Sequence, residues 1–356
     1  MEVTTINRSA LTRIGSLVFG VFVLVIFVYF VGVNALEHVL LQVNPSVILI
    51  MVLLQILGLI FYSTAWYVLI RASGYTLRFM TCQGVTFASI FVSYTTPSGV
   101  FMEAVRCMLG SKESGMKLGE STASVILHRI LYVIGFLAST ALAVVALLVT
   151  GTISRSAVLA LAVVPTAAVG GLVILFYLSL SPHRLQPLVE RVLRLGQPLI
   201  RLVEKEAKVD GKADQFLNDY RTGFRKMLAT KFLVVLSFVM SLGDWGCSVV
   251  VLWVVLFALH VHVSFWVIMI TMAIGKMIQM TPLGVPGMLG IYEAAITGSL
   301  SLFAVPVAVA ASAALLSRIV TSWLELPITG IAAYHYGFKA IGKRSLAIRV
   351  SLTSQS

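Results

Sequence analysis

Apolar residues form long unbroken runs along the chain, and short segments that carry most of the Lys and Arg residues separate these runs. Several runs reach the roughly 20 residues that a helix needs to cross a bilayer. The pattern predicts helices over about 14–33, 45–70, 119–149, 156–180, 231–259 and 306–336. Two more apolar stretches, 79–110 and 264–303, are each interrupted near the middle. We therefore expect an all-α membrane protein that crosses the bilayer many times.

The interruption of the second stretch is rich in helix breakers. Two prolines and three glycines lie between Thr281 and Gly290, and Glu293 follows shortly after. This density of Pro and Gly forbids a continuous helix. Irregular backbone at membrane depth is tolerated only where protein or a cavity satisfies its polar groups. A break with an acid beside it therefore predicts a functional site.

The first interrupted stretch repeats this arrangement. In both copies Pro and Gly are followed by Glu-Ala and then, at almost the same distance, by an arginine inside a long apolar helix. The shared order of these elements indicates an internal duplication. The candidate substrate-binding residues are Pro97, Ser98, Gly99, Glu103 and Arg129 in the first copy and Pro286, Gly287, Gly290, Glu293 and Arg318 in the second.

The basic flanks of the runs predict the topology. Lys and Arg accumulate in cytoplasmic loops, which places both termini in the cytoplasm, with the first hairpin (79–110) entered from inside and the second (264–303) from outside. About eight transmembrane or re-entrant units result, in one domain over 1–356. They form two repeats of inverted topology, 11–150 and 156–337. Inverted repeats with broken helices are a transporter architecture with the site near the midplane.

A basic segment, 181–230, separates the repeats. Its apolar residues recur mostly three or four positions apart, and Lys and Arg lie between them. This pattern predicts an amphipathic cytoplasmic connector that lies on the membrane surface. A protein-docking role for the segment is the alternative.

Composition narrows the functional classes. Hydrophobic residues make up 59% of the chain and charged residues only 11%, against about 25% charged in soluble domains. The net charge of +12 comes from residues beside membrane segments, where they meet anionic headgroups. We therefore expect membrane lipids as partners and no nucleic acid, and a homo-oligomer stays open. The three cysteines form no CxxC pair, so we expect no disulfide, no metal site and no cofactor.

The motifs resemble a known family. The Pro-Gly-x-x-Gly-x-x-Glu-Ala run at 286–294, with Ser317 and Arg318 downstream, resembles the second half of the lysylphosphatidylglycerol synthase transmembrane region. The segment at 97–103, with His128 and Arg129 downstream, resembles its first half, although Ser98 stands where relatives often have glycine. The resemblance covers nearly the whole chain. It implies a plasma-membrane protein that moves a lipid between leaflets and, without the soluble synthetase domain, does not transfer lysine.

The chemistry of the motifs favours an anion. Each break starts a half-helix whose N-terminal N–H groups and partial positive charge suit a phosphate, and Arg129 and Arg318 add bidentate hydrogen bonds. We expect an anionic lipid headgroup or a polyprenyl phosphate between the two breaks. Glu103 and Glu293 would pair with the arginines when the site is empty. The alternative is that these pairs are permanent structural locks.

Three other polar residues in the apolar helices could support the site or couple an ion: His128, Asp244 and Lys276. Asp244 and Lys276 could instead pair with each other, and Glu325 lies two helical turns beyond Arg318. An enzyme acting on a lipid phosphate or a polyprenyl-linked sugar is the second functional hypothesis, although the chain has no DxD, HExxH or serine-elbow motif. A non-transporting partner of a lipid-modifying complex is the third.

Overall fold

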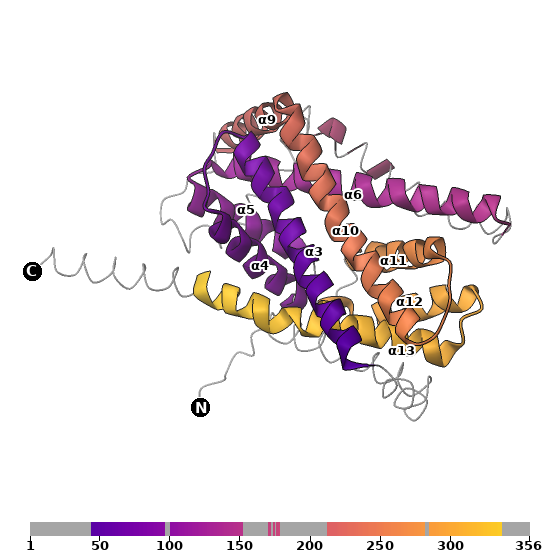
Figure 1. Cartoon of the computed structure of the whole chain (residues 1–356). Coiled ribbons are helices and arrows are strands. Elements are labelled where there is room, and N and C mark those ends of the chain that lie inside the picture. The colour runs from indigo at the N-terminus through magenta and orange to yellow at the C-terminus, as the bar shows by residue number, and fades with distance from the viewer. Residues whose placement is uncertain are drawn as a thin grey trace, which may run out of the picture. The chain divides into compact units, whose positions relative to one another are not determined.

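The computed structural model describes residues 44–96, 100–151, 170, 171, 174, 176–178, 212–281 and 285–336 (Figure 1). Within these ranges every regular element is a helix, and the described residues contain no strand. The predicted helix over 14–33, most of the one over 156–180, the connector up to 211 and the residues Pro97, Ser98 and Gly99 lie outside them.

The helices agree with the pattern of the sequence wherever they are described. Each interrupted stretch consists of two helices, so both predicted breaks are confirmed at the level of the elements. The uninterrupted helices are α3 (Pro45–Ala72), α6 (Leu118–Val149), α9 (Lys212–Ala229), α10 (Lys231–Ala258) and α13 (Val307–Arg318). The interrupted stretches give α4 (Phe79–Thr95) with α5 (Val100–Ser114), and α11 (Phe265–Met280) with α12 (Ile291–Leu302).

Four helices of the described part are long and apolar enough to cross a bilayer: α3, α6, α10 and the run Val307–Tyr336, which begins with α13. The protein is therefore a helical membrane protein that passes through the bilayer several times. The count of about eight units, the inverted repeats and their boundaries stay predictions.

The chain forms two compact units. Unit 1 comprises Met1–Ile60, Gln83–Arg106 and Asp244–Ser356, and unit 2 comprises Phe61–Cys82 and Cys107–Gly243. Both breaks belong to unit 1, because the first lies between α4 and α5 and the second between α11 and α12. Arg129 belongs to unit 2.

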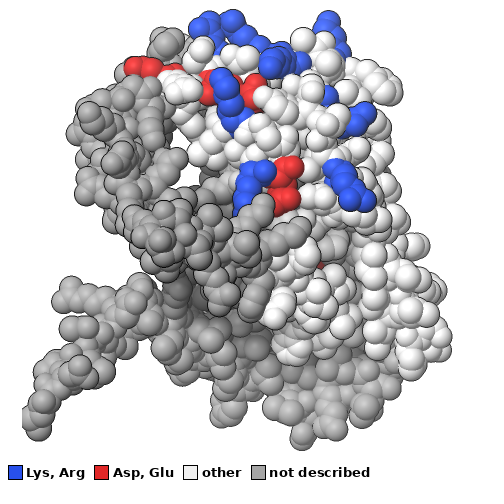
Figure 2. Space-filling view, turned by 90° about the vertical axis from the view of Figure 1, so that its left-hand side faces the viewer, with Lys and Arg blue, Asp and Glu red and all other residues white. Residues whose placement is uncertain are grey.

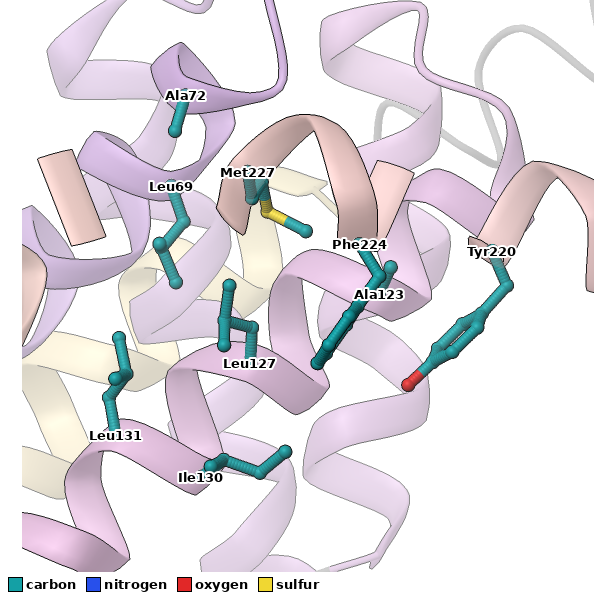
Figure 3. Close-up of a cluster of buried hydrophobic side chains, with 9 residues drawn as sticks. All are labelled: Leu69, Ala72, Ala123, Leu127, Ile130, Leu131, Tyr220, Phe224 and Met227. Atoms are coloured by element: carbon teal, nitrogen blue, oxygen red, sulfur yellow. The ribbon is translucent and has the colours of Figure 1, made fainter. Parts of the chain in front are cut away.

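Unit 2 is organised around the first half of α6. Apolar residues recur on α6 at helical spacing and meet side chains from α3 and α9 (Figure 3). The cluster comprises Leu69, Ala72, Ala123, Leu127, Ile130, Leu131, Tyr220, Phe224 and Met227. Gly119 permits close approach of α9, since a Cβ there would lie 2.4 Å from the carbonyl oxygen of Phe216. The last part of the basic connector thus packs against α6.

Charged groups surround this apolar cluster. Lys117 Nζ lies 2.7 Å from Asp219 Oδ1, and Lys226 Nζ lies 3.2 Å from Glu120 Oε1. The hydroxyl of Tyr75 donates to Glu120 Oε2 at 2.6 Å. Figure 2 shows such neighbouring acidic and basic side chains on the surface. These contacts tie α9 and the loop after α3 to the start of α6.

In unit 1, α12 lies between α11 and α13 (Figure 1). The hydroxyls of Thr271 and Ser299 lie 2.9 Å apart between α11 and α12. A Cβ at Gly275 would come within 2.7 Å of Ile296 and Tyr292. This close packing fixes the start of α12, where the second break ends.

Candidate functional site

The second break is a short irregular turn between α11 and α12. A 3₁₀ turn over Pro286–Met288 follows the end of α11, and α12 begins at Ile291. Gly287 and Gly290 have φ values of 61° and 78°, a region that only glycine enters without strain. The prediction that glycines would shape this break is confirmed at these two positions.

Glu293 caps the helix that starts at the break. Its Oε2 accepts a hydrogen bond from the backbone N–H of Gly290 at 2.7 Å, as the acidic residue of a capping box does. Gly290 has no side chain to make the reciprocal bond. The side chain of Glu293 is 1% exposed, so its carboxylate takes the place that an anion prefers at a helix N-terminus.

Arg318 faces this carboxylate from α13. Its Nε lies 3.2 Å from Glu293 Oε1, and its side chain is 2% exposed. The guanidinium carbon also lies 4.8 Å from the ring centroid of Tyr292, which adds a cation–π contact. The predicted pairing of Glu293 with Arg318 is therefore present in the structure.

The guanidinium retains capacity for a further acceptor. Its Nη1 is buried, and no partner within the described ranges accepts a hydrogen bond from it. Its Nη2 lies 3.8 Å from the position that a Cβ of Gly287 would occupy. Unused donors of a buried guanidinium beside an irregular turn suit a second anionic group.

The helix that carries Arg318 changes its geometry directly after this residue. Ile319–Trp323 form a π turn, and the helix resumes over 325–336. A π turn holds one more residue than an α turn and occurs frequently at functional sites. Because of this extra residue, Glu325 is offset from the position two regular turns beyond Arg318 that the sequence suggested.

Glu325 joins three segments of unit 1. It is 5% exposed, and the amide nitrogen of Gln55 in α3 donates to its Oε1. The hydroxyl of Tyr94 in α4 lies 2.6 Å from its Oε2 and 3.1 Å from the carbonyl oxygen of Thr321 in the π turn. The sequence pattern did not single out Gln55 or Tyr94, although both are polar residues within apolar runs.

Tyr94 also brings the end of α4 next to the second break. It lies near the end of α4, just before the first break, and its carbonyl oxygen and Cδ1 lie 3.9 and 3.8 Å from the Cβ position of Gly287. The end of α4 therefore lies against the turn that Arg318 faces.

The acid of the first break forms an ion pair within its own helix. Glu103 Oε2 lies 2.6 Å from Arg106 Nη2 within α5, with side-chain exposures of 22% and 0%. Arg129 and His128 belong to unit 2, where His128 is buried and contacts the ring of Tyr62 at 4.7 Å between centroids. The pairing of Glu103 with Arg129 stays a prediction.

The remaining candidates lie on α10 and α11. Asp244 is 8% exposed, and its Oδ1 lies 3.1 Å from the Cβ position of Gly58 in α3. Lys276 lies half-buried on α11, and its predicted pairing with Asp244 stays a prediction. In the part of the chain that the structure describes, no three His, Cys, Asp or Glu residues come together to hold a metal ion.

The sequence of this chain is similar to a family of membrane proteins. The family model described as lysylphosphatidylglycerol synthase TM region matches residues 13–328. A UPF0104 membrane protein of Methanothermobacter thermautotrophicus is 23% identical over 92% of this chain and 96% of its own length. The UPF0104 membrane protein MJ1595 of Methanocaldococcus jannaschii is 25% identical over 84% of this chain and 87% of its own length.

Proposed function

Since the chain belongs to the lysylphosphatidylglycerol synthase TM region family, we propose that it moves an anionic lipid, or a lipid linked to polyprenyl phosphate, between the leaflets of the plasma membrane. The observation that carries the proposal is the buried guanidinium of Arg318 beside the second break. Its charge is balanced by Glu293, and its Nη1 donors are unused within the described residues.

Glu293 makes the contacts that a lipid headgroup would make at this site. Its carboxylate holds the N–H group at the start of α12 and the charge of Arg318 at the same time. A phosphate oxygen has the same charge preference and can accept more hydrogen bonds. An arriving headgroup would therefore take over Arg318 and displace Glu293, which can bind a proton meanwhile.

The position of the breaks supports one shared site. Both breaks lie in unit 1, and Tyr94 connects the end of α4 to Gly287. A headgroup bound at the second break would thus also lie near the first break. Glu103 is the acid expected to take part from that side, with Arg129 as its predicted basic partner.

Headgroup translocation in proteoliposomes tests the proposal. The lipid panel contains fluorescent zwitterionic and anionic phospholipids and a labelled polyprenyl phosphate, and an impermeant quencher reports the outer leaflet. We expect transport of an anionic lipid by the wild-type protein and loss of transport with Arg318→Gln or Arg129→Gln. Arg225→Gln removes one exposed charge of α9 and should leave transport unchanged.

The same experiment decides against the proposal if the wild type moves no lipid. If Arg129→Gln and Arg318→Gln also unfold, the arginines are structural locks, and the search would turn to an enzyme acting on a lipid phosphate or to a partner of a lipid-modifying complex. A chemically altered lipid recovered from the vesicles would favour the enzyme.

A further inference from the structure

The carboxyl group of Glu325 has a hydrogen-bond arrangement that the exchange between Glu293 and a headgroup does not use. It lies inside unit 1, with the amide of Gln55 on one oxygen and the hydroxyl of Tyr94 on the other. Tyr94 is also within 3.1 Å of the carbonyl oxygen of Thr321.

The number of available hydrogens distinguishes the two protonation states of this carboxyl. The hydroxyl of Tyr94 has a single hydrogen, and the carbonyl of Thr321 can only accept. If Glu325 is ionised, Tyr94 can satisfy either the carboxylate or the carbonyl. If Glu325 is protonated on Oε2, its own O–H donates to Tyr94, and Tyr94 donates to Thr321. Only the protonated form turns both contacts into hydrogen bonds.

We propose that Glu325 is a proton-binding site, protonated in the conformation that the structure shows, and that loss of its proton detaches Tyr94 from the π turn that follows Arg318. The step breaks one O–H bond of Glu325 and passes the proton to water or to a headgroup phosphate. The role of this proton site in transport rests on the proposed function. The binding of the proton to Glu325 does not depend on that function.

The surrounding charges allow both states. Asp244 on α10 disfavours a second negative charge at Glu325, and Lys276 on α11 favours it. Gln55 donates to the carboxyl in either state. Ionising a carboxyl that is only 5% exposed is unfavourable, whereas a hydrogen-bonded neutral carboxyl avoids this cost.

Tyr94 links the proton site to the anion site. Its hydroxyl contacts Glu325 and Thr321, while its ring edge lies 3.8 Å from the Cβ position of Gly287, where Arg318 Nη2 is equally close. When Glu325 is ionised, the hydrogen of Tyr94 turns to the carboxylate and releases the carbonyl of Thr321. The π turn directly after Arg318 thereby loses a contact, so protonation and anion binding act on the same segment.

Infrared difference spectroscopy on the protein in lipid membranes tests the proton site without a transport assay. The C=O stretch of a protonated carboxylic acid is separate from the bands of carboxylates. Spectra recorded over a pH titration should show such a band, and Glu325→Gln should remove it. Gln is isosteric with protonated Glu and keeps a donor toward Tyr94, so we expect this variant to fold.

Glu293→Gln is the matched control, because Glu293 is an equally buried glutamate paired with an arginine. It should leave the acid band in place. If Glu325→Gln does not fold, Tyr94→Phe gives the assignment, since loss of the hydroxyl 2.6 Å from Oε2 must shift the frequency of the band. An acid band that is absent, or that neither variant alters, overturns the proposal.

Transport adds the functional arm of the test. With an imposed pH gradient, wild-type transport should change its rate, and Glu325→Gln should respond at least tenfold less while still moving lipid. Transport that is equally gradient-dependent in this variant excludes a coupling role. If the acid band behaves as expected but the wild type moves no lipid, the proton site stands and the proposed function fails.

Discussion

Two ion pairs, one in each unit, show how differently the protein uses charge. Arg318 and Glu293 in unit 1 are 2% and 1% exposed, whereas Lys117 in unit 2 is 59% exposed beside an Asp219 that is 14% exposed. The buried pair has the longer separation, 3.2 Å against 2.7 Å between nitrogen and oxygen. The pair with the shorter contact is therefore the one that water screens.

The difference lies in what fixes each pair. Lys117 reaches its partner through a flexible side chain in solvent, so entropy and screening cancel most of the attraction. Glu293 is held by the N–H group of Gly290, and Arg318 lies over the ring of Tyr292. The fold thus imposes a geometry on the buried pair that leaves donors of the guanidinium unused, and this makes it the better candidate for ligand exchange.

Removing Arg318 should produce the largest effect. Arg318→Gln leaves the carboxylate of Glu293 buried without its cation, which should lower the free energy of unfolding by about 3–5 kcal/mol. Unfolding in mixed detergent micelles, followed by circular dichroism, measures the loss.

The double variant Arg318→Gln/Glu293→Gln sharpens this result. It removes both charges and should recover at least about 1 kcal/mol relative to Arg318→Gln alone, which a double-mutant cycle reports as a coupling energy. A single variant as stable as the wild type would show that the pair contributes nothing to the fold.

The packing of α9 on α6 should give the next largest effect. Gly119→Ala introduces a Cβ that would lie 2.4 Å from the carbonyl oxygen of Phe216 and 2.8 Å from the backbone nitrogen of Tyr220. These backbone atoms can move away only if the whole of α9 shifts. We therefore expect the free energy of unfolding to fall by about 1–3 kcal/mol, measured by the same unfolding experiment.

Gly298→Ala is the control for this substitution. Gly298 is an exposed helical glycine of α12, and a Cβ there meets nothing within 4 Å. Alanine should stabilise the helix by up to about 1 kcal/mol. Equal effects of the two substitutions would contradict the close approach of α9 and α6.

A smaller effect is expected at Tyr75, where a carboxylate accepts the phenolic hydrogen. The hydrogen bond to Glu120, together with burial, raises the pKa of Tyr75 from about 10 to about 12. The folded state thus prefers the neutral phenol, so this contribution is complete below pH 10 and is lost as the pH rises from about 10 to about 12. Tyrosinate absorbance should show one late-titrating residue fewer in Tyr75→Phe than in the wild type.

Tyr75→Phe should also lower the free energy of unfolding near pH 7 by about 1.5 kcal/mol. This is the lower end of the range found for hydrogen bonds to charged groups. Glu120→Gln should move the titration of Tyr75 back toward pH 10. A titration that stays near pH 12 in Glu120→Gln would assign the shift to burial alone.

The helices of the described part follow directly from the sequence, because long apolar runs leave few alternatives to a membrane helix. The density of Pro and Gly located the second break between α11 and α12, and the separation of α4 from α5 was equally visible at Pro97 and Gly99. The π turn at Ile319–Trp323 was missed although the sequence contains a signal for it. Pro327 lies inside the same helix and cannot donate a backbone hydrogen bond to the carbonyl of Trp323, four residues before it.

The candidate site could be predicted only in part. The pairing of Glu293 with Arg318 followed from the cost of leaving either charge alone in an apolar helix. Glu103 contacts Arg106 within α5, a pairing that the spacing of one helical turn favours, and its pairing with Arg129 stays a prediction. The role of Tyr94 depends on which helix ends lie against each other, and periodicity contains no such information.

The smallest effect should come from the exposed pair itself. Lys117→Ala removes the partner of Asp219, and the hydrogen bond from Lys117 to Asp219 raises the pKa of this lysine. Any contribution to stability is therefore present below the usual lysine pKa near 10.4 and fades above it. Because water and salt screen the pair, the variant should unfold within experimental error of the wild type, and 1 M NaCl should remove any residual difference. A loss as large as that of Arg318→Gln would mean that α9 is held to the start of α6 by charge rather than by the apolar contacts of Leu127, Phe224 and Met227.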